Sequence, residues 1–407
     1  MIIVRQSKKP LCKENVHNRT FSLSFCVTCR EIPAFFDFMN QQLWQALILA
    51  LGAFALGSCI GSFLNVVIYR VPRNLSVNLP RRSFCPNCKR AIPWWENIPI
   101  FSWWMLKGKC KGCDQRIPFR YWLVEAFTAL LFLFVWAHYG MPRSPAYWIF
   151  VSLLISATFI DMEFYIIPLR ISIGGTVAGL ICCAIWPELM DQNHWHEGLM
   201  YSFFSAAAAF GVLWCVVELG KIVFGRKKLT FEPAETWSIH QMDIEMAPQF
   251  RLGSEEYDWW ELFNRPKDIL HITCVELEVN DRQFKAVEVQ LSCDVLRANG
   301  ETFSLEEIDS ISGKTTAVVI PREAMGFGDV YFLAMIGAFL GWKAILFVIA
   351  AASIVGTFMA IIPRILKKVQ WSARIPFGPY LAVGALIWLF YGPQLMDWYF
   401  GLFHGRE

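Results

Sequence analysis

Long apolar stretches recur along most of the chain, separated by polar segments. They lie near residues 42–68, 122–138, 147–167, 171–186, 199–224, 327–342, 344–363 and 378–399. A helix needs about 20 predominantly apolar residues to cross about 30 Å of hydrocarbon, so each stretch predicts a membrane-spanning helix. Several are short or interrupted by Gly and Pro, which spanning helices tolerate. The pattern predicts an all-α polytopic membrane protein with about eight transmembrane helices.

A different pattern occupies residues 225–321. This segment begins polar and acidic, and then ILHITCVELEVN and FKAVEVQLSCDVL alternate apolar and polar residues around NDRQ. Alternation with period two, rich in Val and Ile, predicts a β-hairpin. We therefore expect a small inserted β-rich domain. Its aromatic cluster YDWWELF is expected to pack this domain on the membrane face, with docking of a partner as the alternative.

These patterns divide the chain into six expected segments. The first, 1–38, lacks a continuous apolar core and is expected to be a disordered extension or to precede a translation start at Met39. The others are the first transmembrane helix at 39–69, a cysteine-containing loop at 70–120, transmembrane helices at 121–224, the insertion at 225–321 and the last helices at 322–407.

Composition and charge agree with a membrane protein. Of the 407 residues, 55% are hydrophobic and only 17% are charged, which is too apolar for a soluble domain of this length. The segment 70–120 carries eleven Lys and Arg against two acids. Because positively charged loops stay cytoplasmic, this loop is expected inside, and alternate threading puts the insertion on the same side. The net charge of +3 reflects this bias, and no nucleic-acid partner is expected.

Four cysteines of this loop have the spacing of metal ligands. CPNC contains Cys85 and Cys88, and CKGC, after twenty-one further residues, contains Cys110 and Cys113. Two Cys-x2-Cys pairs suit tetrahedral Zn²⁺ in a zinc ribbon. Disulfides are the alternative, which a reducing cytoplasm disfavours. We expect a closed, structural zinc site in this loop.

Two aspartates stand at the ends of apolar stretches on the expected cytoplasmic side. Asp161 follows VSLLISATFI, and Asp329 in GFGD precedes VYFLAMIGAFLGW. Ionisable groups at membrane depth usually face a bundle interior or a water-filled cavity. Two neighbouring carboxyls do not easily ionise together, so one can hold a proton while the other activates water, as in aspartic proteases. Gly326 and Gly328 would allow a substrate strand to approach. The alternative is a helix cap at Asp329 and an interfacial acid at Asp161.

Taken together, six segments resemble the type IV prepilin peptidases. GSFLNVVIYRVP, the paired CxxC, RYWLVEAFTALLF, IDMEFYIIP, GFGD and IPFGPYLAVGA occur in the order found in that family, and the resemblance covers about 40–225 and 321–400. It implies a bacterial inner-membrane aspartic endopeptidase whose catalytic pair is Asp161 and Asp329. The implied substrates are type IV prepilins and pilin-like subunits of type II secretion.

The resemblance also implies N-methylation of the new terminus with S-adenosylmethionine, although no Gly-rich fingerprint marks a site for the methyl donor. Partners are expected to be these pilin-like proteins and the lipid bilayer. Two other functions remain open: a GxGD membrane protease with another substrate, and a non-enzymatic transporter or scaffold in which the acids relay protons or cap helices. The sequence leaves the oligomeric state undetermined.

Overall fold

The computed structural model describes ten parts of the chain. They are residues 31–80, 82–224, 226–240, 248–263, 268–280, 282–305, 308, 310–321, 326–365 and 376–403. Two units are distinguished, 1–52 and 53–407, and the described residues of the first unit are helical. Helix α1, Glu31–Arg70, therefore begins before residue 39, where the first helix was expected. Residues 1–30 of the predicted extension lie outside the described residues.

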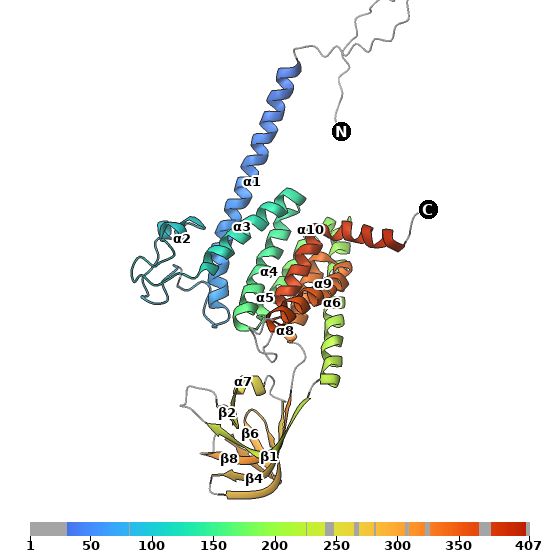
Figure 1. The fold of residues 1–407 in the computed structure, drawn as a ribbon. Helices are drawn as coiled ribbons and strands as arrows, with labels where there is room; N and C mark the ends of the chain where they lie inside the picture. Colours follow the sequence, from blue (N-terminus) through green and yellow to red (C-terminus); the bar gives the residue numbers. More distant parts are fainter. Residues whose placement is uncertain are drawn as a thin grey trace, which may run out of the picture. The chain divides into compact units, whose positions relative to one another are not determined.

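Each of the eight predicted apolar stretches forms a helix (Figure 1). They are α1, α3 (Phe119–Tyr139), α4 (Ser144–Phe164), α5 (Leu169–Ile185), α6 (Trp195–Phe224), α8 (Phe327–Leu340), α9 (Trp342–Ile365) and α10 (Gly378–Phe403). Within the described residues, five are long and apolar enough to cross a membrane, namely α1, α3, α4, α6 and α9. The structure therefore supports five candidate spans, and the predicted eight stay a prediction.

Of the three predicted helices outside that group, two are too short to span a bilayer alone. Helices α5 and α8 contain 17 and 14 residues, which correspond to roughly 26 and 21 Å of rise, less than a hydrocarbon core of about 30 Å. Helix α10 has 26 residues with Pro393 inside it, and it is also not among the five. Such helices are accommodated in a bilayer where neighbouring helices cover them.

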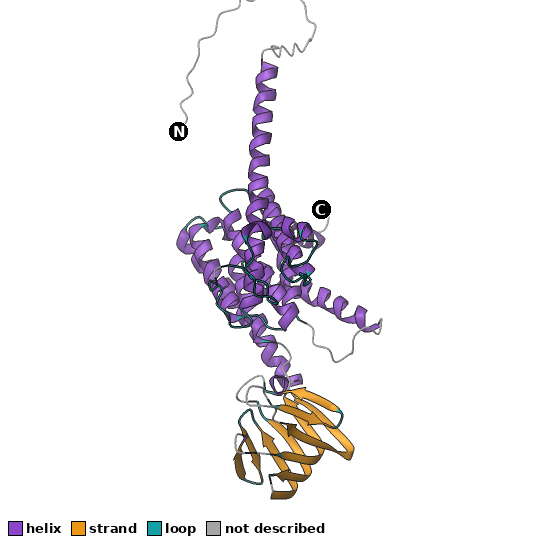
Figure 2. Cartoon of the chain, turned by 90° about the vertical axis from the view of Figure 1, so that its left-hand side faces the viewer, coloured by secondary structure: helices purple, strands orange, loops and turns teal. Residues whose placement is uncertain are grey.

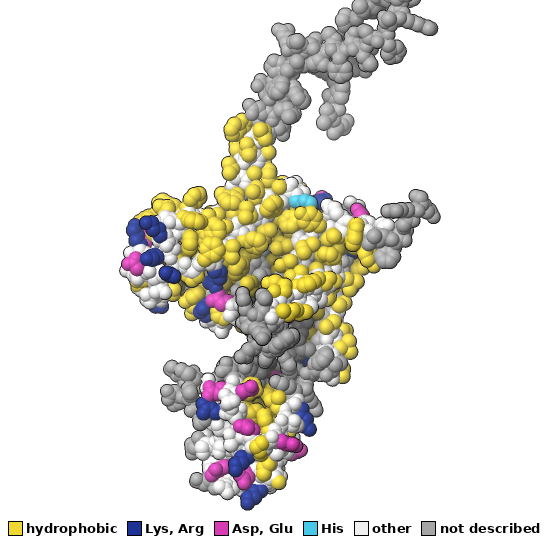
Figure 3. Space-filling view, in the orientation of Figure 1, with side chains coloured by type: hydrophobic (Ala, Val, Ile, Leu, Met, Phe, Trp, Pro, Cys, Tyr) yellow, Lys and Arg dark blue, Asp and Glu magenta, His cyan; other side chains and the backbone are white. Residues whose placement is uncertain are grey.

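The helical part is apolar both inside and outside. Helix α8 lies in its core, where the side chains of Leu333, Ile336 and Phe339 are fully buried. Around the core, large apolar side chains such as Phe203 and Leu346 remain exposed, and Figure 3 shows hydrophobic atoms dominating this surface. A surface of this kind fits a hydrocarbon solvent, because apolar side chains are as stable in contact with lipid as they are inside the protein.

Two glycines bring α1 close to α3. A Cβ added to Gly57 would lie 2.8 Å from the Cα of Ala129, and one added to Gly61 would lie 2.7 Å from the Cα of Glu125. Small residues spaced four apart allow such backbone contact between membrane helices. Glu125 is thereby held directly beside α1.

The cysteine loop, residues 71–118, joins α1 to α3 and contains two short helices, η1 (Trp94–Glu96) and α2 (Phe101–Met105). Its start is anchored by Arg70, a buried side chain whose Nη1 donates hydrogen bonds of 2.9–3.1 Å to the carbonyl oxygens of Ser76, Val77 and Pro80. Because a buried guanidinium is stable only when its donors are satisfied, these contacts define how the loop leaves the helix.

The insertion folds into one antiparallel sheet in the order β3-β2-β1-β8-β4-β5-β6-β7, drawn in orange in Figure 2. The strands are β1 (Arg226–His240), β2 (Gln249–Leu252), β3 (Glu255–Asp258), β4 (Leu270–Val279), β5 (Arg282–Leu291), β6 (Val295–Ala298), β7 (Glu301–Ser304) and β8 (Ile311–Pro321). The predicted hairpin is confirmed as β4 and β5, in which Val279 pairs with Arg282. Asn280 has φ 52°, as a tight primed turn requires.

The aromatic cluster of the insertion packs within its own domain. Trp259 begins the short helix α7, Trp259–Leu262, and is buried together with Leu262 and Phe263 in the core of the sheet. These side chains therefore pack, but in the core of the sheet and not on the membrane face as expected. Cys274 is buried there as well, whereas Cys293 is only partly buried.

Candidate functional site

Asp161 lies in the last turn of α4, and its side chain is buried. The helix ends because Tyr165 adopts the left-handed conformation at φ 56° and donates its N–H to the carbonyl oxygen of Asp161 at 2.9 Å. Pro168 then prevents continuation as one helix and precedes α5. The segment IDMEFYIIP thus forms a sharp connection that leaves Asp161 at the end of its helix.

Asp329 lies in the first turn of α8 and is also buried, with 9% of its surface exposed. Gly326 occupies the N-cap position in extended conformation, and its carbonyl oxygen accepts the N–H of Asp329 at 3.2 Å. Asp329 is therefore not the N-cap residue itself, as the helix-cap alternative supposed. Its carboxyl lies inside the bundle, where removal from water is costly unless it has a role or a partner.

The two carboxyls come from helices far apart in sequence and lie close enough for their charges to repel each other. Ile167 joins their surroundings. A Cβ added to Gly328 would lie 3.1 Å from the Cβ of Ile167, and one added to Gly378 would lie 2.9 Å from its Cδ1. Two buried carboxyls in such proximity are the arrangement that acid–base hydrolysis by a carboxyl pair requires.

Gly378 is a site residue that sequence reasoning did not single out. Its backbone N–H, at the start of α10, donates a hydrogen bond of 3.0 Å to Oδ2 of Asp161. A helix N-terminus is a favourable place for a carboxylate because its amides are free and its dipole is positive. The available signal was the glycine that opens an apolar stretch in IPFGPY, which suggests close approach only once the partner is known.

A cluster of ionic side chains lies beside the aspartate pair. Glu163 forms an ion pair with Arg120 at the start of α3. It forms a second ion pair, at 3.9 Å, with Arg73, which lies just after α1. The guanidinium of Arg73 also lies over the rings of Tyr69 and Phe164. These contacts hold the ends of α1, α3 and α4 together two residues after Asp161.

The two Cys-x2-Cys motifs form equivalent turns. Cys85 donates its N–H to the carbonyl oxygen of Arg90 at 3.0 Å, and Cys110 donates to that of Gln115 at 2.9 Å. The offset of five residues is the same in both turns. Such knuckles present two thiols each on the same side, as a zinc ribbon needs.

The four sulfurs converge on one point. Their Sγ atoms all lie within 4.8 Å of one another, and those of Cys85 and Cys113 are 3.8 Å apart. Tetrahedral Zn²⁺ with Zn–S bonds of about 2.3 Å separates its sulfurs by about 3.8 Å. The donor set therefore fits a metal, formed by Cys85, Cys88, Cys110 and Cys113.

Local hydrogen bonds favour the thiolate form of two of these ligands. The backbone N–H of Gln115, followed by the side chain of Asn87, lowers the pKa of Cys113 to about 7. The backbone N–H of Cys88 lowers the pKa of Cys85 from its ordinary value. Since the thiolate is the form that binds metal, both contacts favour metal binding at the site.

Two family models match the chain. The bacterial peptidase A24 N-terminal domain matches residues 55–139, and the type IV leader peptidase family matches 148–230 and 303–361. Asp161 and Asp329 both fall in the segments of the second match. The interruption of that match lies within the inserted sheet.

Three relatives are each named a prepilin leader peptidase/N-methyltransferase. The protein from Myxococcus xanthus (strain DK1622) is 30% identical over 77% of this chain, which spans only 63% of that relative. The protein from Aeromonas hydrophila is 28% identical over 84% of this chain and 90% of its own length. The protein from Dichelobacter nodosus is 33% identical over 45% of this chain and 70% of its own length. No solved structure gives a significant match. From the family models and these relatives together, the chain belongs to the type IV leader peptidase family.

Proposed function

We propose that this chain is a membrane aspartic endopeptidase that removes the leader of type IV prepilins and of pilin-like subunits of type II secretion. The name of the relatives includes an N-methyltransferase, and the proposal includes that this chain N-methylates the new terminus with S-adenosylmethionine. The observation that carries the peptidase proposal is the meeting of two buried carboxyls, Asp161 and Asp329, from separate helices.

The chemistry follows from that pair. One carboxyl holds a proton and polarises the scissile carbonyl, while the other, as carboxylate, takes a proton from the attacking water. A pair of this kind titrates as a unit, so the base is not assigned to one residue. The N–H of Gly378 holds the Asp161 carboxyl in a fixed orientation for this task.

The substrate class fits the position of the pair. A prepilin carries a basic leader followed by an apolar helix, so the leader remains cytoplasmic while the helix lies in the bilayer. The scissile bond between them lies at the membrane boundary. Asp161 and Asp329 stand at helix ends, and the proposal includes that these ends face the cytoplasm of an inner-membrane protein with eight spans.

The zinc site has a structural part in this proposal. Four protein thiolates leave no open position on Zn²⁺, so the ion stabilises the cysteine loop and takes no part in hydrolysis. The catalytic residues are then the two aspartates alone.

The proposal is tested by co-expressing the full chain with a prepilin in a host without its own leader peptidase, followed by mass spectrometry of the pilin N terminus. We expect a pilin shortened by its leader and heavier by one methyl group. A precursor that stays intact beside folded, membrane-inserted enzyme, for every prepilin tried, contradicts the peptidase function and favours a transporter or scaffold. Cleavage of unrelated membrane peptides alone would indicate the other GxGD substrate class.

Gly378→Ala is expected to slow leader cleavage by about 10²-fold, because misplacing a reacting group by about 1 Å has effects of this size. The added Cβ would lie 2.7 Å from Oδ2 of Asp161, so the carboxyl must move. Initial cleavage rates in detergent measure the effect. The matched control is Gly211→Ala in α6, where an added Cβ meets nothing within 4 Å. Equal rates for both variants would show that Gly378 does not position Asp161.

A further inference from the structure

We propose that the short helix α2 anchors the cysteine loop to the membrane surface, with its apolar side among the lipid headgroups and upper acyl chains beside the start of α3. This side consists of Phe101, Trp104 and Met105, and we call it the α2 face. The inference goes beyond the proposed function, because it concerns a lipid contact of the loop and holds whatever reaction the chain performs.

The apolar side of α2 is the side that points outward. Phe101, Trp104 and Met105 lie at positions i, i+3 and i+4, which places them on one face of the helix. Their exposed fractions are 67%, 62% and 71%. The buried residue of α2 is a polar one, Ser102, whose hydroxyl donates to the carbonyl oxygen of Ile98 at 2.7 Å. A helix on a water-facing surface has the opposite arrangement, so the α2 face requires an apolar partner.

Aromatic rings join α2 to the start of α3. Four rings contact one another in a closed set, with centroids 5.0–6.0 Å apart, namely those of Trp103, Trp104, Phe119 and Trp122. Phe119 is the first residue of a candidate membrane span and is itself 52% exposed. The α2 face is therefore continuous with the outer surface of a helix that is long and apolar enough to cross a membrane.

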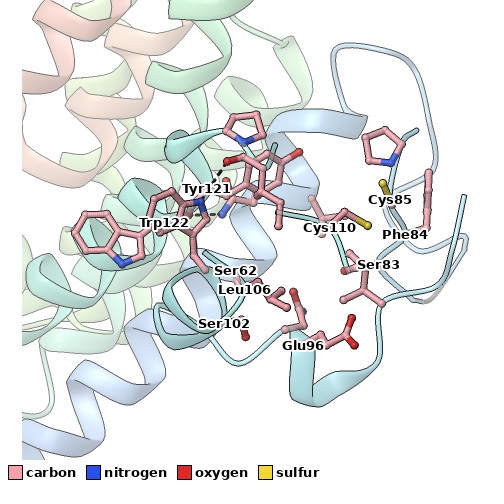
Figure 4. A pocket seen from close by; sticks show the side chains of 18 of the residues that line it. Ser62, Ser83, Phe84, Cys85, Glu96, Ser102, Leu106, Cys110, Tyr121 and Trp122 are labelled. Carbon is pink, nitrogen blue, oxygen red and sulfur yellow. Dashed lines mark hydrogen bonds between the residues drawn. The ribbon is translucent and has the colours of Figure 1, made fainter. Parts of the chain in front are cut away.

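The metal site lies on the other side of the loop. In Figure 4 the indole of Trp122 extends away from Cys85 and Cys110. Seating the α2 face on lipid therefore leaves the cysteine ligands uncovered by the membrane.

A backbone hydrogen bond fixes the orientation of α2. Ile100 precedes the helix, and its N–H donates to Oε2 of Glu125 in α3 at 2.7 Å. Its φ is 66°, an unfavourable value for a β-branched residue, which persists only where surrounding contacts enforce it. The fold therefore holds the α2 face outward against the tendency of apolar side chains to turn away from water.

Positive charge surrounds the α2 face. Residues 97–120 carry five Lys and Arg against one acid, and Figure 3 shows basic side chains gathered at this loop. Lys107 and Lys109 follow α2 closely, are exposed and form no ion pair within the residues that the structure describes. Anionic lipid headgroups complement such charge. Tryptophan together with lysine is characteristic of the boundary between membrane and water.

The attachment of the loop favours lipid over a protein partner. The loop leaves one candidate span, α1, and enters another, α3, so both of its ends lie at the membrane boundary. The ring contacts with Phe119 and Trp122 bring α2 to that boundary as well. An apolar side bordered by basic residues at this depth has the composition of an interfacial segment.

The test uses the full-length, zinc-loaded chain in vesicles of phosphatidylethanolamine and phosphatidylglycerol. The vesicles contain a phospholipid with a photoreactive diazirine near the top of its acyl chain, and mass spectrometry measures the labelled fraction of each peptide. We expect residues 99–106 to be labelled as strongly as the first turns of α3. The reference for an exposed apolar side chain without lipid is the peptide containing Val275, which is 44% exposed in the sheet.

Trp104→Ser is expected to lower the labelling of residues 99–106 about tenfold, since burial of one large apolar side chain contributes at least this factor. The matched control is Trp94→Ser, which replaces an exposed tryptophan of the same loop outside the α2 face and should keep wild-type labelling. Lys107→Gln is expected to lower the labelling about fivefold with phosphatidylglycerol present and to have no effect in phosphatidylcholine alone. Zinc content reports the folding of each variant.

Labelling of wild-type residues 99–106 no stronger than that of the Val275 peptide overturns the proposal, independently of any variant. The same holds if the α2 face is covered only after a prepilin is added or when two copies of the chain associate, because its partner is then a protein. Undiminished labelling of zinc-loaded Trp104→Ser protein also overturns it.

Discussion

Asp161→Asn and Asp329→Asn are each expected to reduce leader cleavage by about 10²–10⁴-fold, the range associated with loss of an acid–base group. Asparagine keeps the shape of the side chain, and at position 161 it keeps an oxygen for the N–H of Gly378. It cannot take the proton of a water molecule or share one with the other carboxyl. The measurement is the rate of precursor shortening by purified variants, with substrate binding recorded separately.

Both variants should still bind the prepilin, because neither change removes apolar contact surface. Asp191→Asn is the matched control. Asp191 is exposed and follows the short helix η2, Pro187–Met190, so this variant should cleave at the wild-type rate. Cleavage at the wild-type rate by either dyad variant would remove the aspartates from the chemistry. Their burial would then have to be explained as proton relay or as structure.

Removal of zinc is expected to unfold the cysteine loop. Binding of a structural Zn²⁺ contributes about 10–16 kcal/mol in small zinc domains, more than a loop of this size can replace by packing. Cys113→Ser should therefore lose bound metal, measured by atomic absorption, and its loop should be cut rapidly by protease.

The control for this prediction is Cys293→Ser, a partly buried free cysteine of the sheet domain. It should keep one zinc per chain and a protected loop. Undiminished protease resistance of the cysteine loop in metal-free Cys113→Ser protein would mean that packing against α1 and α3 alone holds it, and the site would lose its structural role.

Much of the secondary structure could be predicted because it depends on local patterns. Apolar runs long enough for helices became helices, the alternating pattern around Asn280 became a hairpin, and the cysteine spacing alone indicated four converging thiols. The number of membrane spans was harder to predict, because α5 and α8 are apolar but short. Whether such helices lie across a membrane depends on which neighbouring helices cover them.

The features that sequence reasoning missed depend on contacts between distant segments. Gly378 matters only because its N–H meets Asp161, and Gly61 only because it meets the backbone of Glu125. Glu125 is likewise distinguished only by a contact from the cysteine loop, the N–H of Ile100 donating to its Oε2 at 2.7 Å. Contacts of this kind have no periodicity, so no pattern in a single sequence announces them.

The pairing of the first and last strands of the insertion has a consequence for how this chain could arise. Arg226 in β1 lies opposite Pro321 in β8, so the sheet begins and ends at one place. To the polypeptide before and after it, the domain is a closed loop whose ends already meet, and lengthening such a loop has only a weak, logarithmic effect on entropy. A duplicated or acquired domain of this topology can enter between two helices in a single genetic event without altering how those helices fold.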